Sequence, residues 1–264
     1  MANSISYREI SKQFTAKAGV VTALENFNFE IDAQEFIVIV GPSGCGKTTL
    51  LSLTAGLLSA SGGAILLDDH PVIGPGPDRA VVFQDFSLFP WKTVEENISF
   101  GLRINGIAAQ ERQQLMTRAI EMIGLVGFEK HFPDQLSGGM QQRVAIARAF
   151  VLRPKVLLMD EPFAALDAMN RTLMQEELVR IWSEDKPTVL FITHSVEEAI
   201  YLADRVLVMT RRPGSIKELV NVHDFCGVGG HWRHGSLDGA MARKEFQELR
   251  RQIWNSVKEE IGGQ

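Results

Sequence analysis

The chain is poor in cysteine and carries no excess of positive charge. Only two of its 264 residues are cysteines, Cys45 and Cys226. Two cysteines do not make a disulfide framework, so a disulfide-rich secreted scaffold is excluded and a reduced, cytosolic protein is expected. The formal net charge at pH 7 is −5, and this acidic balance gives no support to nucleic acid as a partner.

Long apolar runs are also absent. No uninterrupted run approaches the roughly 18 residues that a membrane span requires, and the first residues show no apolar segment of a secretion signal. If the protein works at a membrane, another chain must hold it there. Apolar residues nevertheless make up 45% of the sequence, which is ordinary for a globular protein with a sizeable core. The length of 264 residues suits one large domain or one domain with an appendage.

Short, almost wholly apolar runs recur at residues 36–40, 80–83, 156–159, 189–192 and 206–209. Strands that are buried on both faces have this composition, and parallel sheets require it. Helical patterns lie between several of these runs, so the sequence predicts an α/β core with a mainly parallel sheet. Residues 4–31 contain polar and apolar residues in alternation, which predicts an antiparallel β layer at the N-terminus.

The domain organisation follows from changes in pattern along the chain. Residues 87–150 have mostly helical patterns and no strand candidate, so we expect a helical insertion subdomain within a domain that spans 1–222. Residues 223–239 contain five glycines in seventeen positions and are interpreted as a loop or linker. Apolar residues at helical spacing predict an amphipathic helix over 240–264.

A phosphate-binding loop is the strongest local signal. Residues 41–48 read GPSGCGKT, after an apolar strand candidate and before a helical pattern. Glycines let the backbone curl so that its amides face an anion, and the helix adds the positive end of its dipole. The lysine is expected to reach the β- and γ-phosphates and the threonine hydroxyl to hold Mg²⁺. The predicted nucleotide-binding residues are Gly41, Pro42, Ser43, Gly44, Cys45, Gly46, Lys47, Thr48 and Thr49.

The position of Cys45 in this loop bears on the reactivity of its thiol. Its thiol is expected near a helix N-terminus and near Lys47, and both favour the thiolate. The sequence therefore predicts a reactive cysteine that bound nucleotide would cover.

A pair of carboxylates forms the second landmark. Asp160 and Glu161 follow the apolar run at 156–159, and ligands of open α/β sheets bind at the carboxyl ends of strands. Asp160 is a candidate Mg²⁺ ligand, and Glu161 is a candidate for polarising an attacking water. A strand that ends in two solvated acids is the alternative.

The third landmark is LSGGMQ at residues 136–141, before a helical pattern. Ser137, Gly138 and Gly139 offer a hydroxyl and unshielded amides at a helix start, and Gln141 follows them. This combination is a possible second anion-binding surface. An N-capped helix without a ligand explains the same residues equally well.

These three motifs stand in the order and approximate spacing of ATP-binding cassette (ABC) ATPases, which the chain resembles over about residues 4–222. Residues 136–141 resemble the family's signature motif. The resemblance implies a P-loop NTPase fold, ATP and Mg²⁺, with Gln84 and Asp160 beside Thr48 at the metal. It also implies that Gln84 and His194 assist Glu161 in catalysis, that Phe14 stacks on adenine, and that residues 165–167 are the D-loop.

The resemblance implies partners as well. Two such subunits pack head to tail, and each ATP lies between one phosphate loop and the other subunit's signature motif, Ser137 to Gln141. The pair is expected to be a homodimer on the cytoplasmic face of a membrane. It would bind permease subunits and, through them, serve a periplasmic or extracellular substrate-binding protein.

Residues 76–102 resemble the nitrate, sulfonate and taurine importer branch of the family more narrowly. The permease is then expected to dock near residues 86–91, where Trp91 is a candidate anchor; an aromatic cluster folded onto the helical subdomain is the alternative. Two features depart from that branch. Gln34 replaces a usual glycine, and the 223–239 segment carries Cys226 and three histidines, for which metal binding is conceivable but a glycine-rich loop is favoured.

Other functions fit the sequence less well. Translation-type cassettes carry two cassettes in one chain, and this chain has one phosphate loop. DNA-maintenance cassettes place a long coiled coil between phosphate loop and signature, and no long heptad run occurs here. A small-molecule kinase would leave residues 136–141 unexplained.

Overall fold

The computed structural model describes residues 5–16, 19–227 and 230–262. The predictions made above for residues 4, 17–18, 228–229 and 263–264 lie outside the described residues. The chain forms two compact units: the first comprises Met1–Gly76 and Lys186–Gln264, and the second comprises Pro77–Asp185. Each unit is described by itself.

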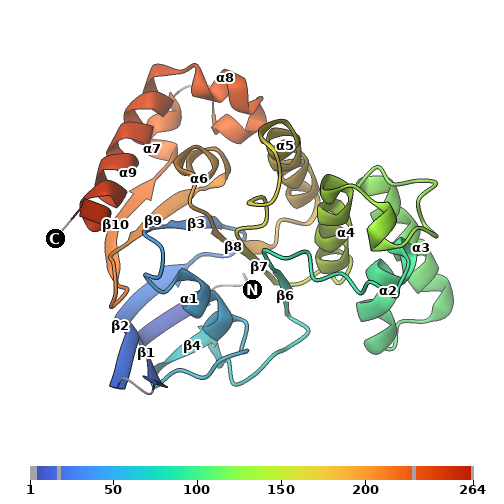
Figure 1. Ribbon diagram of the computed structural model, residues 1–264, viewed down its shortest axis with the longest axis horizontal. Coiled ribbons are helices and arrows are strands. Elements are labelled where there is room, and N and C mark those ends of the chain that lie inside the picture. Colours follow the sequence, from blue (N-terminus) through green and yellow to red (C-terminus); the bar gives the residue numbers. More distant parts are fainter. Residues whose placement is uncertain (1–4, 17–18, 228–229, 263–264) are drawn as a thin grey trace. The chain divides into compact units, whose positions relative to one another are not determined.

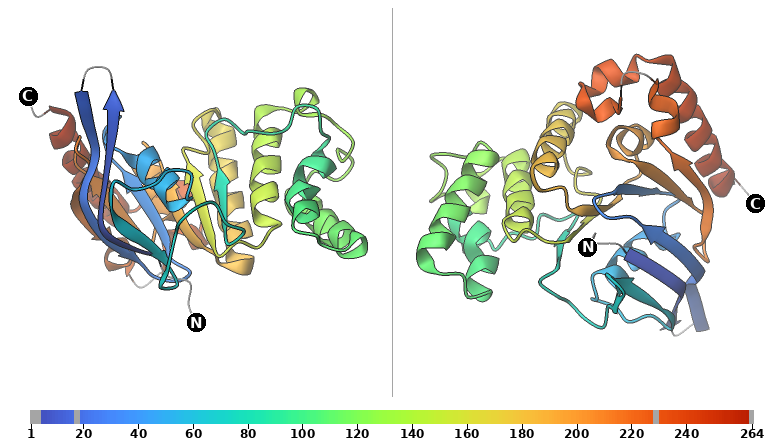
Figure 2. Two further views of the ribbon diagram at one scale, coloured as in Figure 1. Left: turned by 90° about the horizontal axis from the view of Figure 1, so that it is seen from below. Right: turned by 180° about the vertical axis from the view of Figure 1, so that it is seen from behind.

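The first unit contains an antiparallel sheet in the order β2-β1-β4-β5. Its strands are β1 (Ile5–Ala16), β2 (Gly19–Ile31), β4 (Gly62–Leu67) and β5 (His70–Pro71). The alternating residues Phe27, Phe29 and Ile31 of β2 are buried and the residues between them are exposed, as expected for a strand with one covered face. Figure 2 shows β1 and β2 side by side as a long ribbon. The predicted N-terminal antiparallel layer is confirmed.

The same unit contains parallel strands. β3 (Phe36–Val40) lies between β8 (Thr188–Ile192) and β9 (Arg205–Met209) and runs parallel to both. Every residue of β3 and β8 is buried, which explains their uninterrupted apolar sequences. β10 (Ile216–Asn221) pairs antiparallel with β9. The predicted α/β core with parallel strands is confirmed.

Helices complete the first unit. α1 (Lys47–Thr54) follows β3, and α6 (Val196–Leu202) follows β8. The C-terminal part consists of α7 (His223–Cys226), the 3-10 turn η3 (Trp232–His234), α8 (Leu237–Met241) and α9 (Lys244–Gly262). Figure 1 shows α9, in red, running along β10, and Phe246, Leu249 and Ile253 on its inner face are buried.

The second unit has two parallel strands, β6 (Arg79–Val82) and β7 (Val156–Asp160), and mostly helical sequence between them. Its helices are α2 (Val94–Ile104), α3 (Ala109–Met122), the 3-10 turn η1 (Pro133–Gln135), α4 (Gly138–Phe150) and α5 (Ala168–Asp185). Thr93 and Glu96 form a capping box that starts α2, and this pairing satisfies two backbone amides of the first turn. The helical content predicted for 87–150 is present.

The segment predicted as a loop at 223–239 is more structured than expected. Its described residues include α7, η3 and α8. The reason lies in apolar side chains that the glycine count obscured: Trp232, Leu237 and Cys226 are buried, and the Trp232 ring packs on Phe246 of α9 with centroids 5.1 Å apart. Buried apolar area holds these short turns in place despite the glycines between them.

Candidate functional site

The phosphate loop begins where the buried strand β3 ends. Gly44 and Gly46 have φ angles of 75° and 109°, which side chains with a Cβ adopt at a cost. Gly46 is also crowded, because a Cβ added there would lie 2.9 Å from the carbonyl oxygen of Ala23. These two glycines turn the chain from β3 into α1, which begins at Lys47. The strand, turn and helix context predicted for the motif is therefore present.

Lys47 is held inside the loop. Its side chain is mostly buried, and Nζ donates hydrogen bonds to the carbonyl oxygens of Gly41 (2.8 Å) and Pro42 (3.0 Å). Ser43 and Thr48 are exposed, and Thr49 is half-buried. The loop thus presents one buried cation, a hydroxyl at the first turn of α1, and the amides of a helix start, which together are suited to an anionic ligand.

The expectation of a reactive Cys45 needs correction. The thiol is almost fully buried, and burial raises its pKa above the ordinary value although Lys47, whose Nζ lies 3.8 Å from Sγ, acts in the opposite direction. Desolvation of the thiolate costs more than the nearby ammonium returns. The sequence indicated the cation and the helix start, but it could not indicate how completely the loop encloses the sulfur.

His194 lies at the same edge of the first unit as the phosphate loop. Ile39 of β3 pairs with Ile192 of β8 in the parallel register, so Gly41 and His194 each stand two residues beyond paired strand residues. The Thr193 amide donates to the carbonyl oxygen of Ile39 (3.2 Å) and fixes this alignment. The exposed His194 then precedes Ser195, which caps α6.

Phe14 lies on β1, paired with Val21 of β2. The residue is 38% exposed, and Lys12 Nζ lies 5.0 Å from the ring centroid. The residue therefore offers an accessible aromatic face rather than filling a strand core. That geometry is compatible with stacking on a flat ring.

In the second unit, three more predicted residues lie at one edge of the paired strands β6 and β7. Val82 of β6 pairs with Met159 of β7, so Gln84 and the Asp160 and Glu161 pair both follow the carboxyl ends of neighbouring parallel strands. Both carboxylates are half-buried, and Gln84 is exposed. Glu161 has a φ of 45°, a conformation that is uncommon for a residue with a side chain and often marks a functional position.

The 136–141 loop is an N-capped helix start. Ser137 Oγ accepts the amide of Met140 (3.3 Å) as α4 begins. The Gln141 amide nitrogen donates to the carbonyl oxygens of Pro133 (2.9 Å) and Leu136 (3.2 Å), so this side chain supports the shape of the loop. Ser137 and Gly138 are exposed and Gly139 is half-exposed, which leaves their backbone accessible.

The predicted D-loop residue Asp167 caps the next helix. Its two carboxylate oxygens accept the backbone amide of Asn170 (3.0 Å) and the Asn170 side-chain amide (2.6 Å). These hydrogen bonds lower the pKa of Asp167 below its ordinary value. A Cβ added at Gly139 would lie 3.7 Å from the Asn170 side-chain oxygen, so the signature loop and the start of α5 are neighbours within this unit.

The aromatic residues after Gln84 divide into a packed and an exposed part. Phe89 packs on Phe100 of α2 at 4.6 Å between centroids, and Arg148 of α4 donates to the carbonyl oxygens of Ser87 and Phe86. Trp91 remains 70% exposed. The aromatic cluster is thus partly packed onto the helices. Trp91 is exposed, and Arg148 holds the segment before it through hydrogen bonds.

Two histidines of the C-terminal part lie close to an aspartate, and ring nitrogens of both already have partners in the protein. Ligand atoms of Asp204, His223 and His231 lie within 4.8 Å of one another. However, His231 Nε2 bonds to the carbonyl oxygen of Ala203 (2.6 Å) and its Nδ1 accepts the Arg233 amide (3.2 Å), so both ring nitrogens are engaged. The Arg233 guanidinium also pairs with the Asp204 carboxylate.

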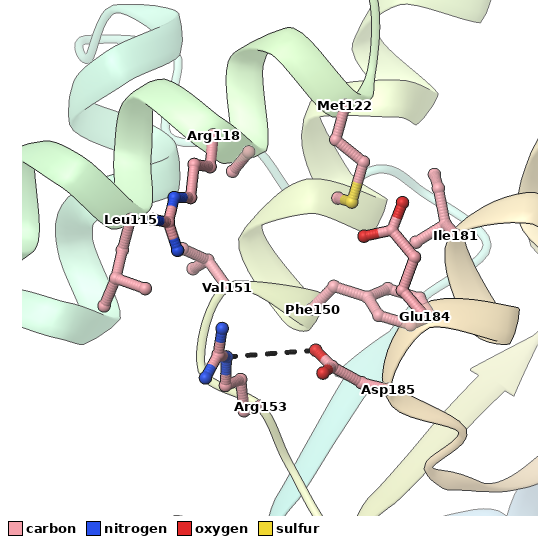
Figure 3. A pocket seen from close by; sticks show the side chains of 10 residues that line it. Leu115, Arg118, Met122, Phe150, Val151, Arg153, Ile181, Glu184 and Asp185 are labelled. Carbon is pink, nitrogen blue, oxygen red and sulfur yellow. Dashed lines mark ion pairs between the residues drawn. The ribbon is translucent and has the colours of Figure 1, made fainter.

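A separate hollow of about 180 Å³ lies in the second unit between α3, the end of α4 and α5 (Figure 3). Arg153 and Asp185, on facing sides, form an ion pair at 3.9 Å, and Glu184 pairs with Arg180 at 3.6 Å. Because these charges compensate one another, we assign the hollow no ligand.

Some structural residues had no motif to indicate them. Glu35 is buried and forms an ion pair with Arg205, whose Nη2 lies 2.7 Å from Glu35 Oε2. Arg212 donates to the phosphate loop from 168 residues away in sequence. Only the fold brings such partners together. Among the described residues, no helix is both long and apolar enough to cross a membrane.

Comparison with protein families and curated proteins gives consistent matches. The family model described as "ABC transporter" matches residues 24–164. An uncharacterised ABC transporter ATP-binding protein of Methanocaldococcus jannaschii is 48% identical over 263 residues, covering 99% of this chain and 94% of that protein. A nitrate import ATP-binding protein of Synechocystis is 47% identical, covering 81% of each chain. An aliphatic sulfonates import ATP-binding protein of Bacillus thuringiensis is 44% identical, covering 82% of this chain and 85% of that protein.

A solved structure shares the fold. It is the dimeric ATP-binding cassette MJ0796 in a post-hydrolysis state bound to ADP and Pi, which matches with a TM-score of 0.73 and 30% identity, covering 83% of this chain and 98% of that one.

Proposed function

Since the chain belongs to the ABC transporter family, we propose that it is the ATP-hydrolysing subunit of a membrane importer for a small anion such as nitrate or a sulfonate. The observation that carries the proposal is the phosphate loop at 41–48, in its strand, turn and helix context, within a chain that matches import ATP-binding proteins over about four-fifths of its length. Taurine, which is itself a sulfonate, belongs to the same group of candidate substrates.

We assign ATP to the phosphate loop and its surroundings. Residues 41–49 would hold the phosphates, with the Lys47 ammonium turning from the Gly41 and Pro42 carbonyl oxygens toward the β- and γ-phosphates. The exposed ring of Phe14 would stack on the adenine.

The donor set fits Mg²⁺. Thr48 supplies an exposed hydroxyl, Gln84 an amide oxygen and Asp160 a carboxylate, and hard oxygen donors are what this ion prefers. When bound, Mg²⁺ would neutralise charge on the β- and γ-phosphates. The assignment rests on the order of the motifs and on the chemistry of these three side chains.

The remaining residues would act on the attacking water and the γ-phosphate. The Glu161 carboxylate would accept a hydrogen bond from the water and draw its proton as it attacks. Gln84 would orient the water, and His194 would stabilise the charge that develops on the γ-phosphate. The unusual backbone of Glu161, with φ at 45°, would aim the carboxylate beyond the strand end.

Two partners follow from this assignment. A second copy of the chain would present Ser137, Gly138 and Gly139 to the ATP, with Gln141 supporting that loop; a helix start that meets a polyphosphate gains affinity only while ATP is bound. A permease would dock at residues 86–91, which would place the protein peripherally on the cytoplasmic face of a membrane. A periplasmic or extracellular binding protein would deliver the anion to that permease.

The decisive experiment uses Glu161→Gln. The amide keeps the size of the side chain but cannot act as an anionic base, so ATP should still bind while the hydrolysis rate falls by about a hundredfold or more. Size-exclusion chromatography with light scattering should show the variant shifting from monomer to dimer when Mg-ATP is added. Near-normal turnover of Glu161→Gln would remove this carboxylate from the mechanism.

Two control variants separate the parts of the proposal. Lys47→Ala should lose both ATP binding and hydrolysis, because the loop loses its buried cation. Ser137→Arg in the Glu161→Gln background should bind ATP yet stay monomeric, because the added side chain crowds the second anion surface. A Glu161→Gln protein that binds ATP tightly and remains monomeric at every concentration would contradict an ATP-bridged pair of isolated subunits.

Identifying the transported substrate requires an experiment on the whole transporter. The subunit would be purified with its permease, reconstituted in vesicles, and tested for ATP-dependent uptake of nitrate, an alkanesulfonate and taurine in the presence of the binding protein. Uptake of none of the three would contradict the small-anion assignment while leaving the ATPase assignment in place.

A further inference from the structure

The turn between β9 and β10 is tightly built. At its base, the amide of Thr210 donates to the carbonyl oxygen of Ser215 (2.9 Å), and the amide of Ser215 donates to Thr210 Oγ1 (3.0 Å). The same hydroxyl lies 3.2 Å from the carbonyl oxygen of Pro213. A turn closed by this many internal hydrogen bonds holds its tip in one position.

This turn lies directly against the phosphate loop within the first unit. Gly214 is buried, its amide donates to the carbonyl oxygen of Ala23 (2.9 Å), and its carbonyl oxygen accepts the amide of Glu25 (3.4 Å). A Cβ added at Gly214 would lie only 2.0 Å from the carbonyl oxygen of Cys45. The backbone of the turn therefore fills the space between β2 and the underside of the phosphate loop, and only glycine fits there.

Arg212, at the tip of the turn, contacts the phosphate loop itself. Its Nε and Nη2 both donate to the carbonyl oxygen of Gly44, each at 3.3 Å. Gly44 has no side chain and a left-handed φ of 75°, so its peptide plane has more freedom than those of its neighbours. A planar, two-pronged donor on that carbonyl restrains the peptide plane at this point.

The end of α9 holds the other side of the turn. Glu260 Oε2 accepts the backbone amide of Arg211 (2.9 Å), and Glu260 Oε1 lies 3.1 Å from Lys217 Nζ on β10. Lys217 also donates to the carbonyl oxygen of Ser256 (2.8 Å) and to Glu259 (2.8 Å). A chain of contacts thus runs from the last turns of α9 through Arg211 and Arg212 to Gly44.

We propose that Arg212 is a positioning residue for nucleotide binding: it holds the phosphate loop in its binding shape through the Gly44 carbonyl, and Glu260 of α9 sets where Arg212 lies. The C-terminal helix would thereby contribute to ATP affinity without touching ATP. This inference rests on the proposed binding of ATP at residues 41–49. It assigns a role in that site to a turn and a helix outside every nucleotide-binding motif.

The test compares two neighbouring arginines. Arg212→Gln removes the two-pronged contact, and loss of a hydrogen bond to a charged donor should raise the Kd and KM for ATP about fivefold while kcat changes less than twofold. Arg211→Gln makes the same change of charge one residue away and keeps the backbone amide that donates to Glu260. It should leave both constants unchanged. Isothermal titration with ATP and steady-state hydrolysis by the full chain give these values.

Glu260→Gln tests the connection to α9. It should weaken ATP binding about twofold, and combining it with Arg212→Gln should add nothing beyond the effect of Arg212→Gln alone, because both act through one chain of contacts. Amide hydrogen exchange at residues 43–46 should quicken in Arg212→Gln and not in Arg211→Gln. If Arg212→Gln does not fold, Glu260→Gln and its hydrogen exchange at residues 43–46 carry the test alone.

Three results would overturn the inference. The first is an unchanged ATP affinity in a folded Arg212→Gln protein. The second is an equal loss of ATP affinity in Arg211→Gln, because it would indicate an effect of charge alone. The third is full additivity of the effects of Arg212→Gln and Glu260→Gln on ATP affinity. Lys47→Ala keeps the two proposals separate. If that variant binds ATP normally, the proposed site is wrong whatever Arg212 does; if it loses binding while Arg212→Gln is normal, only the positioning role fails.

Discussion

Cys45 and Lys47 are separated by one glycine in the phosphate loop, and their environments decide their chemistry in different ways. The ammonium is enclosed but donates to carbonyl oxygens. The thiol is enclosed too, and burial raises its pKa by more than the charge and hydrogen bonds of Lys47 lower it. A nearby cation lowers the pKa of a cysteine, but full burial of the sulfur can outweigh that effect.

We predict that Cys45 reacts slowly with thiol reagents. In folded protein at pH 7.5, without nucleotide, alkylation of Cys45 by iodoacetamide should be at least about tenfold slower than in the urea-unfolded chain, because the thiolate fraction and the access are both reduced. Peptide mass spectrometry measures this directly. Labelling of the folded protein at the unfolded rate would contradict the enclosure of the sulfur.

For single residues, the motifs could be predicted from the sequence, but the distant residues that contact them could not. Lys47, Asp160 and Ser137 stand in local patterns whose chemistry can be read from a few neighbouring residues. The residues that contact the phosphate loop from elsewhere in the chain have no such pattern. Arg212 and Gly214 lie in a short turn whose sequence predicts only a reversal of the chain. Their position against Gly44 and Cys45 depends on strand pairing far along the chain.

Among the elements, the C-terminal part after β10 differs most from expectation. Glycine frequency predicted a loop at 223–239, but Trp232, Arg233 and His231 are buried there. Arg233 donates to the carbonyl oxygen of Leu202 (2.8 Å) and pairs with the Asp204 carboxylate. Buried side chains with long-range partners override local propensity, which is why composition was a weaker guide here than periodicity was for α9.

His231, in the C-terminal part after β10, should make the stability of the protein sensitive to acid. Burial, chiefly, lowers the pKa of His231 to about 4, below its value in an unfolded chain, roughly 6.5. The unfolded state then binds more protons between these values, so stability is complete above about pH 6.5 and falls as the pH drops toward 4, by up to about 3 kcal/mol.

Urea unfolding at a series of pH values measures this loss. His231→Gln should flatten the slope between pH 6.5 and 4, whatever it does to stability at neutral pH. His234→Gln alters an exposed histidine three residues away and should leave the slope unchanged. An unaltered slope in His231→Gln would show that other groups carry the acid sensitivity.

For the whole molecule, the α/β class, the N-terminal antiparallel layer and the helical content of 87–150 followed from periodicity and buried apolar runs. Their agreement with the structure reflects how strongly burial on one or two faces constrains a strand's sequence. The division of the chain into compact units was less accessible, because Met1–Gly76 joins Lys186–Gln264 in one of them, a contact pattern that no local window contains.

For the whole molecule, we predict how the loss of Trp91 affects assembly with a permease. Trp91→Ala should weaken assembly by about tenfold or more, as for the loss of an aromatic anchor, while the isolated subunit keeps its basal ATPase. Trp254→Ala is the matched control, since Trp254 is likewise exposed, at 54%, but lies on α9. Co-purification yield and the affinity of the detergent-solubilised permease would be measured for both. A loss of basal ATPase with assembly intact would instead place Trp91 among the packing residues of its unit.

The four tryptophans also give the protein an optical use. Trp182 and Trp232 are only 5% and 3% exposed, whereas Trp91 and Trp254 are 70% and 54% exposed. Buried indoles emit at shorter wavelength and are shielded from iodide, while exposed ones are quenched by it. A Trp254→Phe chain would therefore carry Trp91 as its dominant quenchable fluorophore, a native label at the surface where we expect the permease to bind, without any attached dye.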